Sequence, residues 1–423
     1  MVTFTSILPW ILLFLVILAV IFRRIGKLEI PAWTAFLIAA IVIVLVQPEG
    51  FNQAVFVLGS QADVFIFLFG MFVIVTALEM SGALQKGAKL LLNKAKTGRA
   101  MLLWILLGFG LAAAVLVNDT VAIIAPILLI TFSKQVGCES KPLVITVALS
   151  LTFGSALLPT GNPQNFILAQ AGNIGFLNFF LWALGPTIIS LVGCYLLTRL
   201  FYRKDFSKQL YTEIPFILDK HEYEKLTIPA LVSLGLILVG MIITTFVNFP
   251  MAYIILIVSG LFLFIRNERR EILARLDWGV LLFFGGMFIV IDAVTNSSIF
   301  QDSLLPIITG LQADIPTFCL FVVVLFGASQ IFSNVPVAII VANILPGTPL
   351  DQPIFWITAA LTTTFAGATT VLGAASNIIV LETSNKRGLN ISWWEFTRVG
   401  FPISIISLIG IFVLGISYLT IAT

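Results

Sequence analysis

The sequence predicts an all-α polytopic membrane protein built from two inverted repeats, and three observations support this fold class. Of its 423 residues, 59% are hydrophobic and only 10% are charged, a composition that soluble domains do not have. Apolar runs of about the length of a bilayer core recur along the whole chain. Motifs of the first half return in the second half at a fixed spacing. The chain is therefore expected to be an integral membrane protein.

Ten apolar segments are expected to cross the membrane. They are residues 7–22, 31–46, 63–80, 142–171, 179–200, 226–246, 251–265, 277–294, 354–383 and 398–420. Two further apolar stretches, residues 101–133 and 315–345, are interrupted by polar residues and are too short for two crossings, which need about 40 residues. We expect both to be re-entrant hairpins with tips inside the protein, because backbone polar groups exposed to lipid cost several kcal/mol each.

The basic residues test this threading. All 23 Lys and Arg residues fall on one side of the membrane in this assignment of spans. The loops on the opposite side contain no Lys or Arg. They are residues 47–62, 172–178, 247–250, 295–314 and 346–353. The positive-inside rule makes the basic side cytoplasmic and places both termini outside. The polar residues 202–225 are then a cytoplasmic linker between repeat 1 (1–201) and repeat 2 (226–423).

The repeat is visible in the motifs. Residues 70–72 (GMF) recur as residues 286–288, and Asn118 corresponds to Asn334 at the same offset. After a small length change, Gly161 and Asn165 correspond to Gly373 and Asn377. Each half has five crossings, so the second copy enters from the opposite side. Repeat 1 contains the hairpin 101–133 and the broken span 142–171, and repeat 2 contains the hairpin 315–345 and the broken span 354–383.

Polar breaks at the hairpin tips and in the broken spans are the candidate substrate- and ion-binding residues. They are Asn118, Asp119, Thr120, Gly161, Asn162, Pro163, Asn165, Ser333, Asn334, Val335, Gly373, Ser376 and Asn377. Proline and glycine free backbone carbonyls for a cation, while the half-helix that follows begins with N–H groups that favour an anion. The structural alternative is that these side chains only form hydrogen bonds with backbone groups where the helix is unwound.

Asp119 is the one carboxylate expected at a hairpin tip. A carboxylate at this depth is costly unless it is paired, protonated or bound to a cation. It could carry the coupling ion, either sodium or a proton, or cap the second hairpin arm. A sodium site is expected at Asn118, Asp119 and Asn334, with no cofactor beyond the coupling ion.

The breaks resemble those of the ion transporter superfamily, which includes arsenite permeases, sodium/proton antiporters, citrate carriers and divalent anion/sodium symporters. The likeness is carried by residues 118–122 (NDTVA), 161–165 (GNPQN), 333–336 (SNVP) and 376–377 (SN), and it extends over nearly the whole chain. It implies an anion-permease-like or citrate-transporter-like member. Such a protein is an elevator transporter, usually a homodimer, whose hairpins and broken helices carry the site past a static scaffold.

The tips depart from the sodium-coupled carboxylate branch, in which both tips typically read Ser-Asn-Thr. The first tip begins Asn118-Asp119 and the second has no threonine. The acidic first tip is more similar to the arsenite permease branch.

Three transport functions are consistent with these features. The leading hypothesis is a cation-coupled secondary active transporter of a small anion, carboxylate-like or an oxyanion. The alternatives are an arsenite/antimonite efflux permease and a sodium/proton antiporter with Asp119 as the exchanging carboxylate. An enzyme is not expected, because the sequence has no cluster of His, Cys or paired carboxylates at depth and no candidate catalytic residue. The lipid bilayer is an expected partner, and nucleic acid is not.

Overall fold

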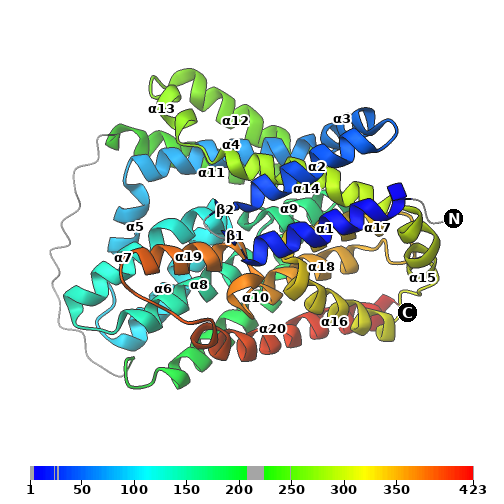
Figure 1. The fold of residues 1–423 in the computed structure, drawn as a ribbon. Helices are drawn as coiled ribbons and strands as arrows, with labels where there is room; N and C mark the ends of the chain where they lie inside the picture. The colour runs from blue at the N-terminus through cyan, green and yellow to red at the C-terminus, as the bar shows by residue number, and fades with distance from the viewer. Residues whose placement is uncertain (1–3, 23, 26–27, 207–222, 248, 423) are drawn as a thin grey trace.

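The computed structural model describes residues 4–22, 24–25, 28–206, 223–247 and 249–422, and it is almost entirely helical (Figure 1). Among these residues, seven helices are long and apolar enough to cross a membrane. They are α4 (Ala62–Met80), α6 (Gly98–Leu116), α10 (Phe176–Phe201), α11 (Thr227–Thr244), α14 (Trp278–Thr295), α16 (Ile315–Phe332) and α20 (Trp393–Ala422).

Shorter apolar helices occupy the remaining predicted spans. They are α1 (Phe4–Phe22), α2 (Ala32–Val46) and α12 (Met251–Ile265). The first broken span consists of α8 (Ser140–Ser155), the short helix η1 (Pro159–Gly161) and α9 (Pro163–Ala171). The second consists of α18 (Pro353–Ala366), η4 (Val371–Gly373) and α19 (Ala375–Lys386). The helix in each of these segments is thus interrupted, after Ser155 in the first and after Ala366 in the second.

The two hairpins pair α6 with α7 (Asn118–Val136) and α16 with α17 (Asn334–Ile344). Their first arms are longer than half of the apolar stretches 101–133 and 315–345. α6 has 19 residues and α16 has 18, so they rise about 27–29 Å at 1.5 Å per residue. The apolar run underestimates the length of α6, because this helix begins at Gly98 and includes Arg99, both of which precede the run.

Some predicted loops also contain helices. They are α3 (Gly50–Ser60), α5 (Ala83–Leu92), η2 (Glu224–Leu226), α13 (Arg269–Ala274), the π-helical η3 (Phe300–Leu304) and α15 (Leu305–Thr309). These segments are short and partly polar, so they do not stand out as apolar runs. A small antiparallel pair, β1 (Arg24–Ile25) with β2 (Leu28–Glu29), is an exception to the all-helical expectation.

The helices form two packed groups (Figure 1). In the first, α1 to α4 pack with α11 to α14; in the second, the hairpins and broken spans pack with α10 and α20. The groups meet where the Phe67 ring of α4 stacks on Phe166 of α9, with centroids 4.1 Å apart. Beside this stack, Gln170 Nε2 donates to Asp63 Oδ2 at 2.6 Å. The polar breaks therefore lie in one group and face the other through α9 and α17.

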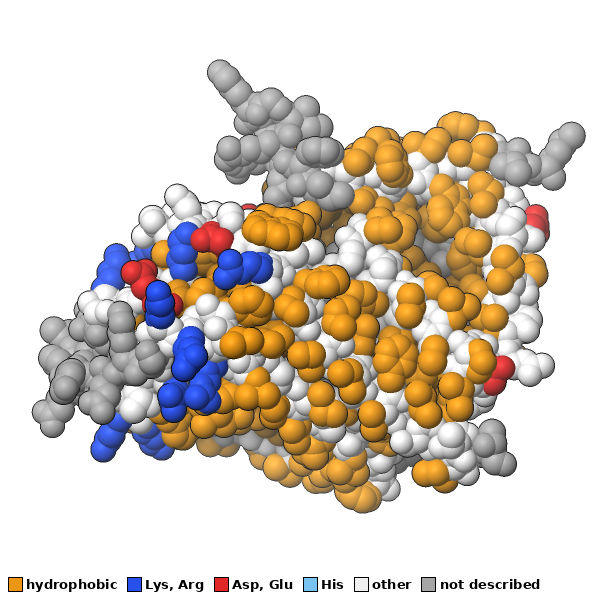
Figure 2. All heavy atoms as spheres, turned by 90° about the horizontal axis from the view of Figure 1, so that it is seen from below, with side chains coloured by type: hydrophobic (Ala, Val, Ile, Leu, Met, Phe, Trp, Pro, Cys, Tyr) orange, Lys and Arg blue, Asp and Glu red, His pale blue; other side chains and the backbone are white. Residues whose placement is uncertain are grey.

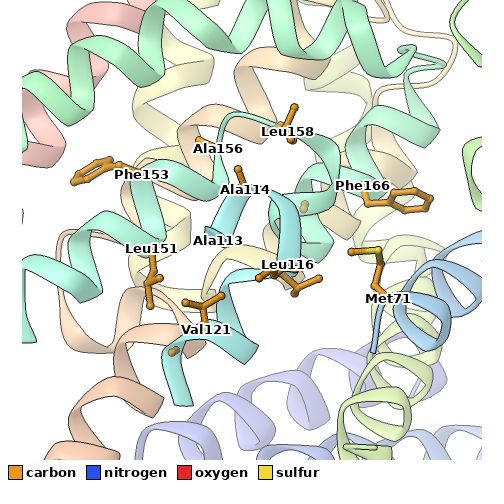
Figure 3. Packing of buried hydrophobic residues seen from close by; sticks show 14 of the residues in the cluster. Met71, Ala113, Ala114, Leu116, Val121, Leu151, Phe153, Ala156, Leu158 and Phe166 are labelled. Carbon is orange, nitrogen blue, oxygen red and sulfur yellow. The ribbon is translucent and has the colours of Figure 1, made fainter. Parts of the chain in front are cut away.

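Small residues allow close packing inside the second group. α6 and α8 approach so closely at Gly110 and Gly154 that a Cβ on Gly154 would overlap the Gly110 backbone. Ser150 of α8 donates to the Leu106 carbonyl at 2.9 Å. Close helix approach through small residues is typical of membrane interiors, and Figure 3 shows Ala113 and Ala114 beside larger apolar side chains.

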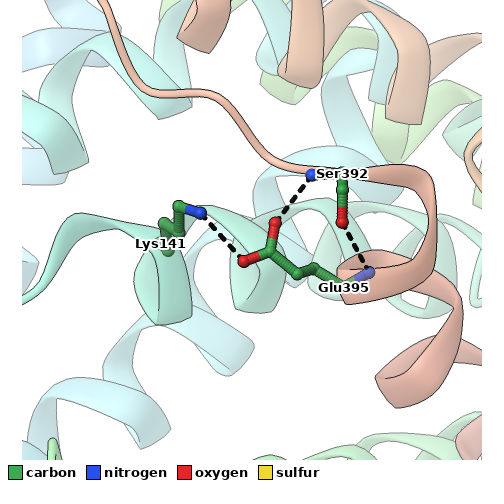
Figure 4. A network of polar contacts seen from close by, with 3 residues as sticks. All are labelled: Lys141, Ser392 and Glu395. Atoms are coloured by element: carbon green, nitrogen blue, oxygen red, sulfur yellow. Dashed lines mark hydrogen bonds and ion pairs between the residues drawn. The ribbon is translucent and has the colours of Figure 1, made fainter.

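Charge gathers at one end of the molecule. On the face shown in Figure 2, Lys and Arg cluster at one end and a broad apolar surface covers the rest. At this end, Lys141 of α8 forms a 2.8 Å ion pair with Glu395 of α20, and Ser392 and Glu395 cap the start of α20 reciprocally (Figure 4). Both termini lie at the other end in Figure 1. The predicted linker falls largely in residues 207–222, outside the described part of the chain.

Candidate functional site

The hairpin tips have a special backbone conformation at equivalent positions. Val117 has φ 67° and Ser333 has φ 66°, although neither is glycine. Such backbone is costly for a residue with a side chain and persists where the surrounding structure holds it. Asn118 and Asn334 directly follow these residues and begin the second arms, α7 and α17.

At the first break, the Asn165 side chain forms hydrogen bonds with the unwound backbone. Its Nδ2 donates to the carbonyls of Ser155, at 3.0 Å, and Leu158, at 3.1 Å. The Leu158 carbonyl also accepts from the Gly161 N–H at 3.1 Å, so the amide adds a second donor there and supplies a donor to the Ser155 carbonyl, where α8 ends. Gly161 is required because a Cβ there would overlap the Ser155 carbonyl oxygen.

The second break repeats this arrangement. Asn377 Nδ2 donates to the carbonyls of Gly367, at 2.7 Å, and Thr370, at 3.1 Å. A Cβ on Gly373 would lie 2.7 Å from the Gly367 carbonyl oxygen. Every position in this set corresponds to its partner in the first break at the spacing that the sequence repeat predicts.

The two breaks are also joined to each other through threonines. Thr364 Oγ1 donates to Asn165 Oδ1 at 3.0 Å, and Thr152 Oγ1 contacts Asn377 Oδ1 at 3.3 Å. Each threonine belongs to the repeat opposite its asparagine, and all four residues are buried. Sequence reasoning missed both threonines, although their matching positions in the two broken spans were a signal that could have found them.

Both hairpin tips contact the second break. Asn118 Nδ2 lies 3.4 Å from Ser376 Oγ. Asn334 Nδ2 lies against Gly367, where an added Cβ would be 2.5 Å from it. The structure thus brings the tips of both hairpins to one break.

The four asparagines divide into two kinds. The amides of Asn165 and Asn377 are fully used by the breaks. The side-chain oxygens of Asn118 and Asn334 are buried and accept no hydrogen bond from any described residue. A buried amide oxygen without a donor is costly, and it is suited to coordinating a cation.

The repeats differ at the first residue of each half-helix. Asn162 caps α9 by accepting from the Asn165 N–H at 2.8 Å, and Pro163 follows it. Its counterpart Ala374 gives α19 no side-chain cap. The N-terminus of α19 therefore keeps more free N–H groups than that of α9.

The remaining predicted residues lie at the edges of the tips. Asp119, Thr120, Ser333 and Val335 are half-buried, whereas Asn118 and Asn334 are buried. No hydrogen bond or ion pair joins the Asp119 carboxylate to another described residue. Among the residues that the structure describes, no group of three or more His, Cys, Asp or Glu side chains could hold a metal ion.

Apolar helices of membrane-spanning length and paired polar breaks within them define the class: an integral membrane transporter. The chain belongs to the citrate transporter family, whose model (CitMHS) matches residues 11–364. This places it in the ion transporter superfamily, among secondary transporters, and confirms a transport role rather than an enzymatic one.

Relatives in sequence agree with this class, and a solved structure has a similar fold. The chain is 28% identical over 375 residues to the uncharacterized transporter MT2759 of Mycobacterium tuberculosis, covering 83% of this chain and 85% of that one. It is 22% identical to the putative transporter arsB of Dictyostelium discoideum, covering 87% and 84% of the two chains. Its fold is similar to that of the Alcanivorax borkumensis YdaH transporter, with a TM-score of 0.60, 14% identity and 99% of each chain covered.

Proposed function

We propose that this protein is a cation-coupled secondary active transporter of a small, carboxylate-like anion. The observation that carries this proposal is the pair of buried, unpartnered amide oxygens of Asn118 and Asn334, which lie where both hairpin tips meet one helix break. Membership of the citrate transporter family supports the substrate class. The coupling ion is sodium or a proton.

The cation would bind at the two tips. Sodium is a hard cation that prefers oxygen ligands, and the Asn118 and Asn334 amide oxygens have no competing donor among the described residues. Asp119, next to Asn118 and without a described partner, would add a negative charge or take up the coupling proton.

The anion would bind at the second break. The free N–H groups at the uncapped start of α19 favour negative charge. Ser376, in the first turn of α19, adds a hydroxyl beside Asn118. The side chains of Asn165 and Asn377 would support the broken backbone rather than contact the substrate.

The mechanism would be an elevator movement between inverted repeats in a homodimer. Support comes from the two helix groups, since the group with all the breaks could move as a body against the other. Further support comes from the recurring element order, with η1 and η4 in corresponding positions. Both termini would be external and the basic end cytoplasmic, by the positive-inside rule.

Efflux of arsenite or antimonite is the second candidate, favoured by the likeness to the putative transporter arsB. Sodium/proton exchange through Asp119 is the third. Proteoliposomes containing the purified protein would be tested with labelled citrate, dicarboxylates, arsenite and sodium, under sodium and pH gradients imposed separately. The proposal expects concentrative uptake of a carboxylate that requires one of the gradients. Movement of arsenite alone, or of sodium against protons without an organic anion, would refute it.

A further inference from the structure

A cavity at the basic end, away from the hairpin tips, is lined by three arginines. Its volume is about 380 Å³, and its lining residues are Arg99, Leu196, Arg199, Leu200, Arg203 and Phe206. Arg99 lies in the first turn of α6, Arg199 lies in the last turn of α10, and Arg203 follows the end of α10. The cavity thus lies between the start of the first hairpin, at α6, and the end of α10.

The three arginines have no ion-pair partner among the residues that the structure describes. No ion pair joins any of them to a described carboxylate, although Lys141 and Lys86 at the same end are paired with Glu395 and Glu224. Three unpaired guanidinium groups around one cavity repel each other, and an anion between them would offset that repulsion. Guanidinium groups bind phosphate oxygens in a bidentate geometry.

The apolar part of the cavity identifies the kind of anion. Leu196, Arg199 and Leu200 lie within one turn of each other near the end of α10, and Arg203 follows directly after the C-cap of this helix. Leu196 is 55% exposed and Leu200 is 67% exposed, as expected for side chains that face lipid. Leucine and arginine alternate here, so lipid-exposed apolar side chains lie directly beside the guanidinium groups, as a lipid with acyl chains and an anionic headgroup requires.

Packing holds the cavity in shape. Phe206 is buried, and the start of α6 lies so close to it that a Cβ on Gly98 would be 2.8 Å from the Phe206 Cα. This contact fixes Arg99 opposite the end of α10. The fold thus holds the backbone of Arg99 beside the end of α10.

We propose that this cavity binds the phosphate headgroup of an anionic phospholipid, with the acyl chains along Leu196 and Leu200. Basic pockets at the cytoplasmic ends of membrane helices are suited to such headgroups. The site is independent of the transported substrate.

The test uses delipidated full-length protein in detergent. Binding of cardiolipin, phosphatidylglycerol and the zwitterionic phosphatidylethanolamine would be measured by native mass spectrometry, and lipid-dependent stabilisation by thermal melts. Inorganic phosphate forms a separate arm. The variant is Arg199→Gln/Arg203→Gln. The matched control is Arg269→Gln/Arg270→Gln, which removes two exposed arginines from α13 at the same end.

Each basic residue near an anionic headgroup contributes about fivefold to affinity, so the cavity variant should bind cardiolipin and phosphatidylglycerol roughly 25-fold more weakly. The control should bind as the wild type does, and Arg199→Lys/Arg203→Lys should lie between them because it keeps the charge without the bidentate geometry. Equal lipid affinity in both glutamine variants would overturn the proposal. Stabilisation by inorganic phosphate as large as that by anionic lipid would also overturn it, because a free anion would then be the occupant.

Discussion

Replacing the four break asparagines one at a time should separate stability from transport. Asn377→Ala removes the bonds from Asn377 Nδ2 to the carbonyls of Gly367 and Thr370, and the acceptor of Thr152. Each buried hydrogen bond contributes about 1 kcal/mol, so the loss should be about 3 kcal/mol. Asn118→Ala removes one bond, at 3.4 Å, and should cost less than about 1 kcal/mol.

The melting temperature in detergent measures this difference. For a chain of this length, about 3 kcal/mol corresponds to a decrease of roughly 3 °C. Asn165→Ala should match Asn377→Ala, because the two breaks have equivalent bonds. Asn118→Ala and Asn334→Ala should melt near the wild-type temperature and yet lose cation-dependent transport. If Asn118→Ala lowered the melting temperature as much as Asn377→Ala, the division of the asparagines into supporting and binding residues would be wrong.

Three further outcomes are expected. Asp119→Asn should abolish or sharply alter the cation dependence of transport with little change in melting temperature. Wild-type dependence on both sodium and pH gradients would show that Asp119 does not carry the coupling ion. Gly373→Ala should sharply reduce the yield of folded, active protein, because its Cβ would lie 2.7 Å from a carbonyl oxygen. Gly327→Ala has open space around it and should behave as the wild type does in size-exclusion and uptake assays. In a background without native cysteines, Ser303→Cys should react with an impermeant thiol reagent in intact cells and Asn93→Cys should not; the reverse pattern would overturn the predicted orientation.

The sequence could indicate where helices are interrupted, because interruptions leave local signals in the chain. Gly161 and Gly373 mark the unwound backbone, and polar residues between apolar runs mark the tips. The structure has helix ends at these places. Apolar runs could not predict α3 or α5, since both are short helices in segments that are too polar or too brief to resemble spans.

The roles of individual side chains could not be predicted in the same way. Asn118 and Asn165 are the same residue type in similar settings, and only the tertiary contacts show that one amide oxygen is free and the other accepts from Thr364. The arginine cavity was missed for a related reason. Arg99 and Arg199 are far apart in the sequence, and each alone is expected to be a solvated cation on the basic side.

The most direct test of the central claim is the steady-state accumulation ratio of a labelled carboxylate in proteoliposomes under an imposed cation gradient. It would be compared between the wild type and Asn118→Ala/Asn334→Ala. The account predicts an internal concentration above the external one for the wild type, collapse of that ratio when an ionophore removes the gradient, and no accumulation by the folded variant. A wild-type ratio that never exceeds one, or a variant that accumulates substrate as well as the wild type, would contradict it.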